Sequence, residues 1–223
     1  MLVAELLASD LEVRYVVGIA ELLEPFSDAA VDLFEAPDRR LSSILSTRSP
    51  QQIAAVATIP SIEPLLDGPL LAQVDMADPG NVGTMIRTAE AAGQAGVVLV
   101  GSCADKWNPK VVRASAGASF RMPVSQCTEE ELFSSRSTPV VATVPSGGSD
   151  YHAVDLRNAT ICIGNEAHGL SPEFVSRCDD AVTIPLAGPT ESLNAAAAAA
   201  VLVFAARDQR RAVTIPTPTR MDR

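Results

Sequence analysis

The chain has 223 residues, which is enough for one large or two small domains with a substantial buried core. Its 47% hydrophobic content excludes a disordered chain, and its formal net charge of −10 argues against a non-specific polyanion binder, since phosphate contacts need Lys and Arg. The four cysteines have no CxxC or Cys/His spacing, so we expect reduced thiols and no metal site.

Residues 1–60 are expected to form a small α/β unit. VRYVVGI at 13–19 is typical of a strand, and residues 21–36 predict a helix, a turn and a further strand. Residues 61–69 hold two prolines and a DGP turn, which favours a linker. The longest apolar run, 195–206, falls short of the roughly 20 residues that cross a bilayer, and the start lacks a basic leader. We therefore expect a cytoplasmic protein without membrane contact.

The rest of the chain, residues 70–223, is expected to be one α/β domain. Helical patterns lie between several of its short apolar runs, which predicts a mostly parallel sheet with helices on both faces. The strand-like runs are 70–75, 96–101, 139–144, 160–164 and 181–185.

A helix is predicted to follow Gly83 and to stop at Gly93. Its apolar face recurs at helical spacing in Val82, Met85, Ile86 and Ala89. Arg87 lies about 100° further round the helix than Ile86, near the edge of that face. It can therefore reach a crevice. The alternative is an exposed helix arginine whose stem packs on the sheet.

Three loops at predicted strand ends are candidate parts of one pocket, because ligand sites of open α/β sheets lie there. The first, DPGNVG at 78–83, lacks the full GxGxxG fingerprint, so we do not expect a nicotinamide cofactor. The second places Glu166 between Gly164 and Gly169; alone, such a glutamate is usually solvated. We expect only a minor structural role for His168.

In the third loop, Ser192 precedes a long helix and is a plausible N-cap. Asn194 is expected inside the first turn, where it costs a few tenths of a kcal/mol relative to Ala. A specific contact of its side chain would explain that placement, whereas two capping polar residues would explain it only partly.

Together the loops resemble the TrmH-type (SpoU) branch of the SPOUT RNA methyltransferases. The matching motifs are DPGNVGTMIRTAEAAG at 78–93, IGNEAHGLSPEF at 163–174 and IPLAGPTESLNAAAAAA at 184–200, within a similarity covering roughly residues 70–207. Residues 2–60 resemble, more loosely, part of the family's L30e-like RNA-binding domain. Its usual opening strand is missing, and the alanine run replaces a more usual valine- and serine-containing one.

The resemblance implies a deep C-terminal trefoil knot and transfer of a methyl group from S-adenosylmethionine to a ribose 2′-hydroxyl of RNA. It favours ribosomal over transfer RNA, without naming the nucleotide, and a homodimer that completes the active site. The implied catalytic residues are Arg87, Asn81, Glu166, Ser192 and Asn194. The implied cofactor-binding residues are Gly164, Ile184, Leu186 and Leu193.

Three alternatives stay open at this point. One is a non-catalytic RNA-binding or assembly protein that keeps the knotted fold. Another is a tRNA ribose methyltransferase, and the third is a small-molecule α/β enzyme, which the acidic charge suggests.

Overall fold

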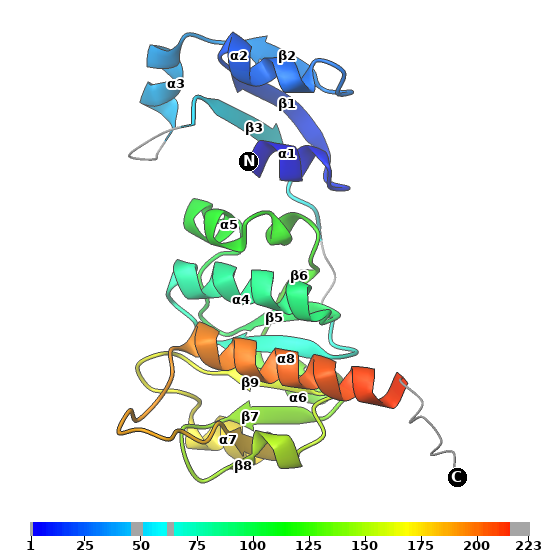
Figure 1. Ribbon diagram of the computed structural model, residues 1–223, viewed down its shortest axis with the longest axis vertical. Coiled ribbons are helices and arrows are strands. Elements are labelled where there is room, and N and C mark those ends of the chain that lie inside the picture. The colour runs from blue at the N-terminus through cyan, green and yellow to red at the C-terminus, as the bar shows by residue number, and fades with distance from the viewer. Residues whose placement is uncertain (1, 46–50, 62–64, 215–223) are drawn as a thin grey trace, which may run out of the picture. The chain divides into compact units, whose positions relative to one another are not determined.

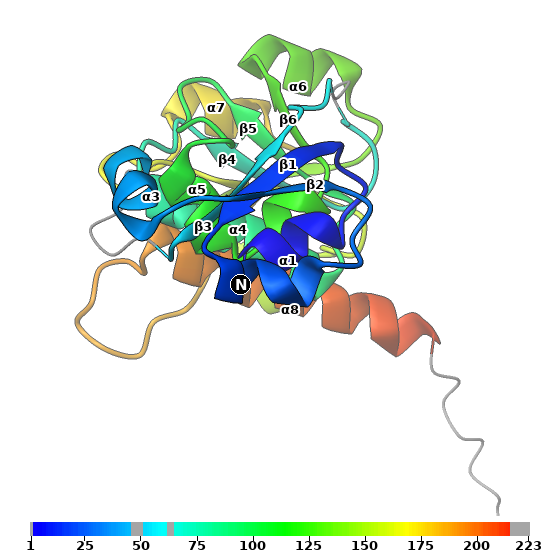
Figure 2. The same cartoon turned by 90° about the horizontal axis from the view of Figure 1, so that it is seen from above.

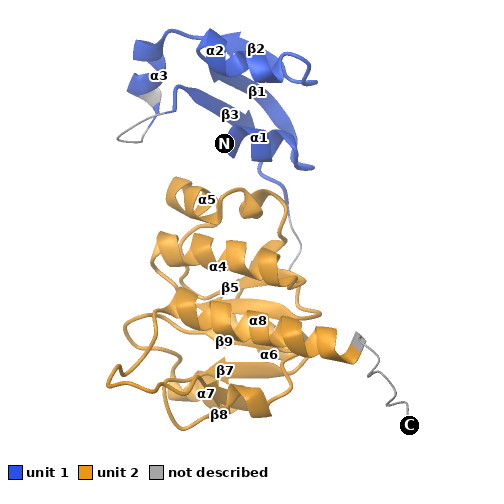
Figure 3. Ribbon diagram, in the orientation of Figure 1, with its two compact units in different colours: residues 1–61 blue, residues 62–223 orange. Residues whose placement is uncertain are grey.

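The structure is a computed structural model that describes residues 2–45, 51–61 and 65–214 (Figure 1). Part of the expected linker (62–64) and the end of the chain (215–223) lie outside this range. The chain divides into two compact units, Met1–Ser61 and Ile62–Arg223 (Figure 3).

The first unit is a three-stranded sheet in the order β2-β1-β3 with short helices. The sheet pairs β1 in parallel with β2 and antiparallel with β3. The predicted strand at 13–19 and the further strand by 36 are confirmed; β3 was not predicted. Its elements are α1 (Leu2–Leu7), β1 (Val13–Gly18), α2 (Ala20–Leu23), a 3-10 turn (Glu24–Phe26), β2 (Asp32–Glu35), α3 (Asp38–Ile44) and β3 (Ile53–Ala57).

The second unit is built on a seven-stranded sheet in the order β6-β5-β4-β9-β7-β10-β8. Every pairing in this sheet is parallel, and the five predicted strands are confirmed. Its strands are β4 (Leu70–Val74), β5 (Gly96–Val100), β6 (Val124–Cys127), β7 (Val140–Thr143), β8 (Ser149–Asp150), β9 (Thr160–Ile163) and β10 (Asp180–Thr183). Its helices are α4 (Pro79–Ala92), α5 (Pro109–Ser115), α6 (Glu129–Ser135), α7 (Pro172–Arg177) and α8 (Ala195–Thr214), with 3-10 turns at Ala118–Phe120 and Tyr151–Ala153.

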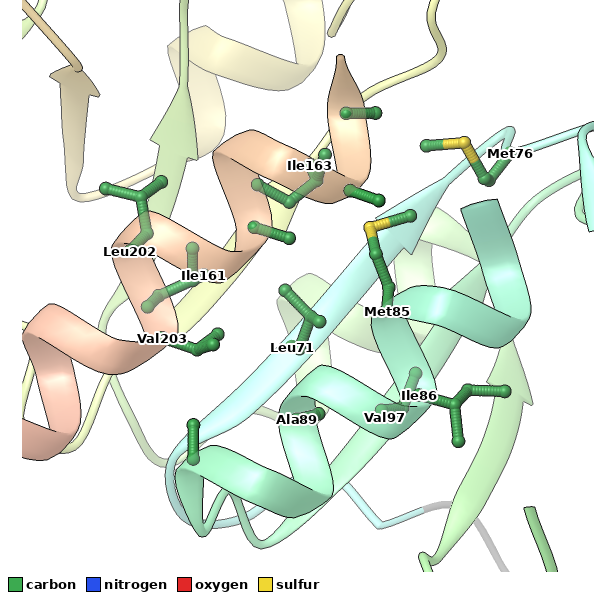
Figure 4. Packing of buried hydrophobic residues seen from close by; sticks show 14 of the residues in the cluster. Leu71, Met76, Met85, Ile86, Ala89, Val97, Ile161, Ile163, Leu202 and Val203 are labelled. Atoms are coloured by element: carbon green, nitrogen blue, oxygen red, sulfur yellow. The ribbon is translucent and has the colours of Figure 1, made fainter. Parts of the chain in front are cut away.

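Helices cover both faces of this sheet, as predicted. Figure 2 shows α4 and α8 on one side and α6 and α7 on the other. Successive residues of β4 point to opposite faces: Leu71 joins the core under α4 and α8, whereas Leu70 joins Phe174 of α7 in the other. Figure 4 shows the first of these cores. Burial on both faces explains why β4, β5 and β9 are nearly continuous apolar runs.

The boundaries of α4 follow from its sequence. Asp78 caps its start, accepting a hydrogen bond from the Asn81 N–H at 2.9 Å, and Pro79 occupies the first turn, where its missing N–H costs nothing. The predicted stop at Gly93 is confirmed: this residue has φ +68°, a left-handed conformation that glycine adopts without strain. The cap fixes where Asn81 and Arg87 lie along the helix.

Over residues 2–45, 51–61 and 65–214, no helix is both long and apolar enough to cross a membrane. The same residues contain no group of three His, Cys, Asp or Glu side chains that could hold a metal ion. All four cysteines are free thiols.

Candidate active site

A cavity of about 510 Å³ opens at the carboxyl ends of β7, β9 and β10 in the second unit. Its walls come from the loops after these three strands and from the start of α8. It is lined by Thr143, Val144, Pro145, Ile163, Gly164, Asn165, Glu166, Ala167, His168, Gly169, Leu170, Ile184, Leu186, Ser192, Leu193, Asn194, Ala195 and Ala198. The volume is that of a typical small-molecule site.

All four predicted cofactor-binding residues line this cavity. Among the predicted catalytic residues, Glu166, Ser192 and Asn194 also line it, while Asn81 and Arg87 do not. The second and third predicted loops therefore form walls of the cavity. The first loop does not line it and is joined to the other two through the hydrogen bonds of Asn81.

The loop after β9 is packed so tightly that its first residue has to be glycine. A Cβ built on Gly164 would overlap the backbone of Gly169 and Leu170. Asn165 holds the turn, since its backbone carbonyl accepts from the Gly169 N–H at 2.8 Å and its side-chain carbonyl from the Ala167 N–H at 2.7 Å. This wall of the cavity is therefore mostly backbone in a fixed conformation.

Asn165 also ties this loop to the neighbouring strand. Its amide nitrogen donates to the backbone carbonyl of Asp75 at 2.9 Å, just beyond the end of β4. Asp75 has φ +51°, an uncommon conformation for a residue other than glycine, and its carboxylate accepts from the Ser102 N–H after β5 at 2.7 Å. The turns after three adjacent strands are thus joined, a role of Asn165 that sequence reasoning missed.

A chain of side-chain hydrogen bonds joins the three predicted loops. The amide of Asn81, in the first turn of α4, donates to the carboxylate of Glu166. The amide of Asn194 donates to the side-chain carbonyl of Asn81 at 3.3 Å. These residues are 85 and 113 positions apart in sequence, yet they meet at the rim of the cavity.

The predicted capping arrangement of the third loop is wrong. Asn194, not Ser192, caps α8: its side-chain carbonyl accepts from the N–H groups of Ala196 at 2.9 Å and Ala197 at 3.3 Å. The helix begins at Ala195, so Asn194 is not inside the first turn. The Asn194 side chain therefore makes two kinds of specific contact, the capping hydrogen bonds and the hydrogen bond to Asn81. Ser192 is an exposed residue of the preceding loop.

Arg87 lies on the exposed surface of α4, about 9 Å of helix rise beyond Asn81. Its guanidinium makes no hydrogen bond or ion pair with any residue that the structure describes. Its five donors are therefore free for a ligand from outside the chain.

Two further groups of lining residues were not singled out from the sequence. Thr143, Val144 and Pro145 follow β7, and the only sequence signal was the Pro that ends this apolar run. Ala195 and Ala198 line the cavity with small side chains from the start of α8. His168, expected to be structural, is an exposed lining residue.

The Cys103 thiol, which follows β5 at this edge of the sheet, is structural. Cys103 donates to the carbonyl of Gln73 at 3.2 Å and accepts from the Met76 N–H at 3.3 Å. Burial raises the pKa of the Cys103 thiol, and the charge of Asp75 adds to the effect. A thiol held protonated in this way is unsuited to nucleophilic catalysis.

Comparison with known proteins gives one consistent family. The family model described as "SpoU rRNA Methylase family" matches residues 69–204, well over half of the chain. The 23S rRNA (guanosine(2553)-2′-O)-methyltransferase RlmP of Bacillus subtilis is 34% identical over 183 residues, which are 79% of this chain and 73% of that protein. The 23S rRNA (uridine(2479)-2′-O)-methyltransferase of Streptomyces viridochromogenes is 34% identical over 199 residues, covering 81% and 69%.

Among solved structures, the SpoU methyltransferase AviRb from Streptomyces viridochromogenes in complex with the cofactor AdoMet superposes with a TM-score of 0.81. The two chains are 27% identical, and the match covers 94% of this chain and 87% of that one. The extent of the family match and the agreement of the fold identify this chain as a member of the SpoU rRNA methylase family.

Proposed function

We propose that the protein transfers a methyl group from S-adenosylmethionine to a ribose 2′-hydroxyl of RNA, and that its substrate is ribosomal RNA. The observation that carries this proposal is the meeting of Asn81, Glu166 and Asn194 at the rim of a cavity walled by backbone. The two named relatives both modify 23S rRNA, at a guanosine and at a uridine. They favour ribosomal over transfer RNA and leave the nucleotide open.

The residues of the cavity fit the proposed cofactor. Ile184, Leu186 and Leu193 give it an apolar lining suited to a flat base, and close packing at Gly164 leaves backbone groups to hold the rest. Glu166 places a carboxylate on the same wall, which suits a ligand with a cationic sulfonium. When bound, S-adenosylmethionine supplies a methyl group that its sulfonium has already activated.

The chain's own residues then position the acceptor and stabilise its charge. Arg87 is a guanidinium cation with no partner among the described residues, so it is suited to orient the ribose or its phosphate and to stabilise a developing alkoxide. It is a poor general base for the same reason. Asn81, Ser192 and Asn194 supply supporting hydrogen bonds, and Asn81 is itself oriented by Glu166.

Arg87 stands outside the cavity of its own chain, which supports a homodimer that completes the site. A groove along α8 offers a surface for a second copy, with apolar groups from Tyr151, Val201 and Phe204. Sedimentation equilibrium at micromolar concentration should give the mass of two chains, and a monomer would contradict this part of the proposal.

Two finer features of the architecture are also proposed, the knot and the division into domains. The sheet order, in which β9 lies between β4 and β7 and the chain then returns through α8 onto α4, supports a C-terminal trefoil knot. The first unit is assigned as a partial L30e-like RNA-binding domain at 1–60, with a linker at 61–69 and the catalytic domain at 70–223. An experimental structure traced continuously from 140 to 214 tests the knot. We place the protein in the cytoplasm, where ribosomal RNA and free thiols are found.

The proposed activity has a two-part test. Calorimetric titration with S-adenosylmethionine should show saturable binding, and methyl-labelled cofactor should label purified ribosomal RNA more than transfer RNA. Binding without transfer to any RNA would favour the non-catalytic alternative. Preferential labelling of transfer RNA would overturn the choice of substrate.

A further inference from the structure

The basic residues of the second unit are unevenly distributed. The chain has only two lysines, Lys106 and Lys110, and Arg113 follows them in the same short stretch. Lys106 is occupied, because its ammonium donates to the carbonyl of Val124. Lys110 and Arg113 are exposed residues of α5, as Arg87 is of α4. The whole chain has a net charge of −10, so this local excess of positive charge calls for a functional explanation.

Most other arginines of this unit already have partners. Five pair with carboxylates on the surface: Arg121 with Glu90, Arg136 with Asp179, Arg157 with Asp155, Arg177 with Glu129 and Glu130, and Arg207 with Asp208. Arg210 donates to the carbonyls of Ala92 and Arg157. Arg87, Lys110 and Arg113 have no acidic partner among the described residues, and the same holds for Arg211 near the end of α8.

The three cations lie on two helices that touch. A Cβ built on Gly83 of α4 would lie 2.6 Å from the Cβ of Ala114 and would overlap the carbonyl of Val111, so the helix axes approach closely there. Arg87 follows Gly83 by about one turn and lies on the same side of α4. Figure 1 shows α5 running beside α4.

On α5, Lys110 and Arg113 are three positions apart and therefore share a face. Each immediately precedes a residue that contacts α4, Val111 or Ala114, which places that face beside the contact. We define the α4–α5 cationic surface as Arg87, Lys110 and Arg113. Gly83, where α4 meets α5, is two residues along α4 from Asn81, which donates to Glu166.

We propose that the α4–α5 cationic surface binds phosphates of the RNA strand that flank the ribose delivered to the active site. The inference rests on the proposed function and names one surface of the second unit that binds the RNA. Unpaired cations bind phosphates without first breaking an ion pair, so this surface is favoured over the paired arginines elsewhere. It also accounts for RNA binding by an acidic chain, since affinity depends on local phosphate contacts.

The test is the double variant Lys110→Gln/Arg113→Gln, compared with Arg211→Gln as a control. Affinity for an in vitro transcript of 23S rRNA is measured between 50 and 300 mM salt. Loss of two phosphate contacts should flatten the slope of log affinity against log salt by about 1.4–1.8 and weaken binding about 25- to 60-fold at 0.1 M salt. Calorimetric affinity for S-adenosylmethionine should stay unchanged, and Arg211→Gln should bind RNA as the wild type does.

An unchanged salt slope in the double variant would overturn the proposal, as would an equal loss in Arg211→Gln. Thermal melting of both variants by circular dichroism shows that they fold. Failure of the proposed function has a different signature. A wild-type protein that binds RNA with the steeper slope but transfers no methyl group would contradict the activity and still support the surface.

Discussion

The cavity and the α4–α5 cationic surface belong to the same unit, yet they are built in opposite ways. The cavity is made of backbone and apolar side chains whose positions are fixed by close packing, as at Gly164. The surface is made of exposed, unpaired charges on two helices. A small cofactor needs a rigid, shaped site, whereas a long polyanion needs charge and tolerates mobile side chains. The cavity is therefore the proposed site for the cofactor, and the α4–α5 cationic surface is the proposed site for RNA.

Turnover should fall most in variants of Arg87. This residue belongs to the α4–α5 cationic surface and is also proposed to act on the acceptor ribose. Replacing Arg87 with Ala removes the charge proposed to stabilise the developing alkoxide, and turnover should fall about 100- to 1,000-fold. Affinity for S-adenosylmethionine by calorimetry should change less than about twofold, because Arg87 lies outside the cavity. Near-normal turnover would remove Arg87 from the mechanism, and Arg87→Lys separates charge from the planar donor geometry.

A second variant breaks the rigid wall without touching a charge. In Gly164→Ala the new methyl group overlaps the backbone of Gly169 and Leu170, so the wall must move, at a cost of about 1–3 kcal/mol in stability. We expect a melting temperature lower by several degrees and cofactor affinity reduced about tenfold or more. Gly188→Ala is the matched control, since a Cβ there meets nothing within 4 Å. Equal behaviour of the two variants would contradict the account of the wall.

The apolar lining should contribute more modestly. Leu193 is 38% exposed in the chain without ligand, so trimming it to Ala leaves the fold intact and removes apolar area available to the cofactor. A loss of about 1 kcal/mol, or roughly fivefold in calorimetric affinity, is expected. An unchanged affinity would show that the cofactor does not reach this side chain.

Two variants of Asn194, at the rim of the cavity, distinguish its capping of α8 from its hydrogen bond to Asn81. Their expected effects are smaller than those above. Asn194→Ala removes the cap of α8 and should lower the free energy of unfolding by about 1 kcal/mol in denaturant titration. Asn194→Asp keeps the capping oxygen and should keep most of that stability. It loses the amide that donates to Asn81, so its turnover should fall while the fold is retained. Equal loss of stability in both variants would contradict the capping role.

The sequence predicted the sheet better than the contacts made at its edge. Strands buried on both faces are nearly continuous apolar runs, which made β4, β5, β7 and β9 predictable. β10 is only partly buried and was predicted from the apolar residues of 181–185. β6 carries Ser125 and Gln126, and β8 has only two residues, so neither showed the pattern. A short apolar run is enough to predict a buried strand, because the residues on both faces of such a strand lie in an apolar environment.

Contacts at the site were less predictable because they join distant parts of the chain. Ser192 and Asn194 are both good capping residues, and only the start of α8 at Ala195 decides between them. The pairing of Asn81 with Glu166 has no local signature, and the resemblance to a family suggested both residues without their contact. Asn165 was missed because an asparagine in a glycine-bearing loop has many ordinary roles.

In the proposed reaction the methyl group goes to a ribose oxygen. Ribosomal RNA labelled by the protein with methyl-labelled S-adenosylmethionine is digested to nucleosides and separated by chromatography with mass detection. The label is expected in a 2′-O-methylated nucleoside and is expected to be absent from RNA treated with Arg87→Ala. Label in a base-methylated nucleoside, or no label with the wild-type protein, would contradict it.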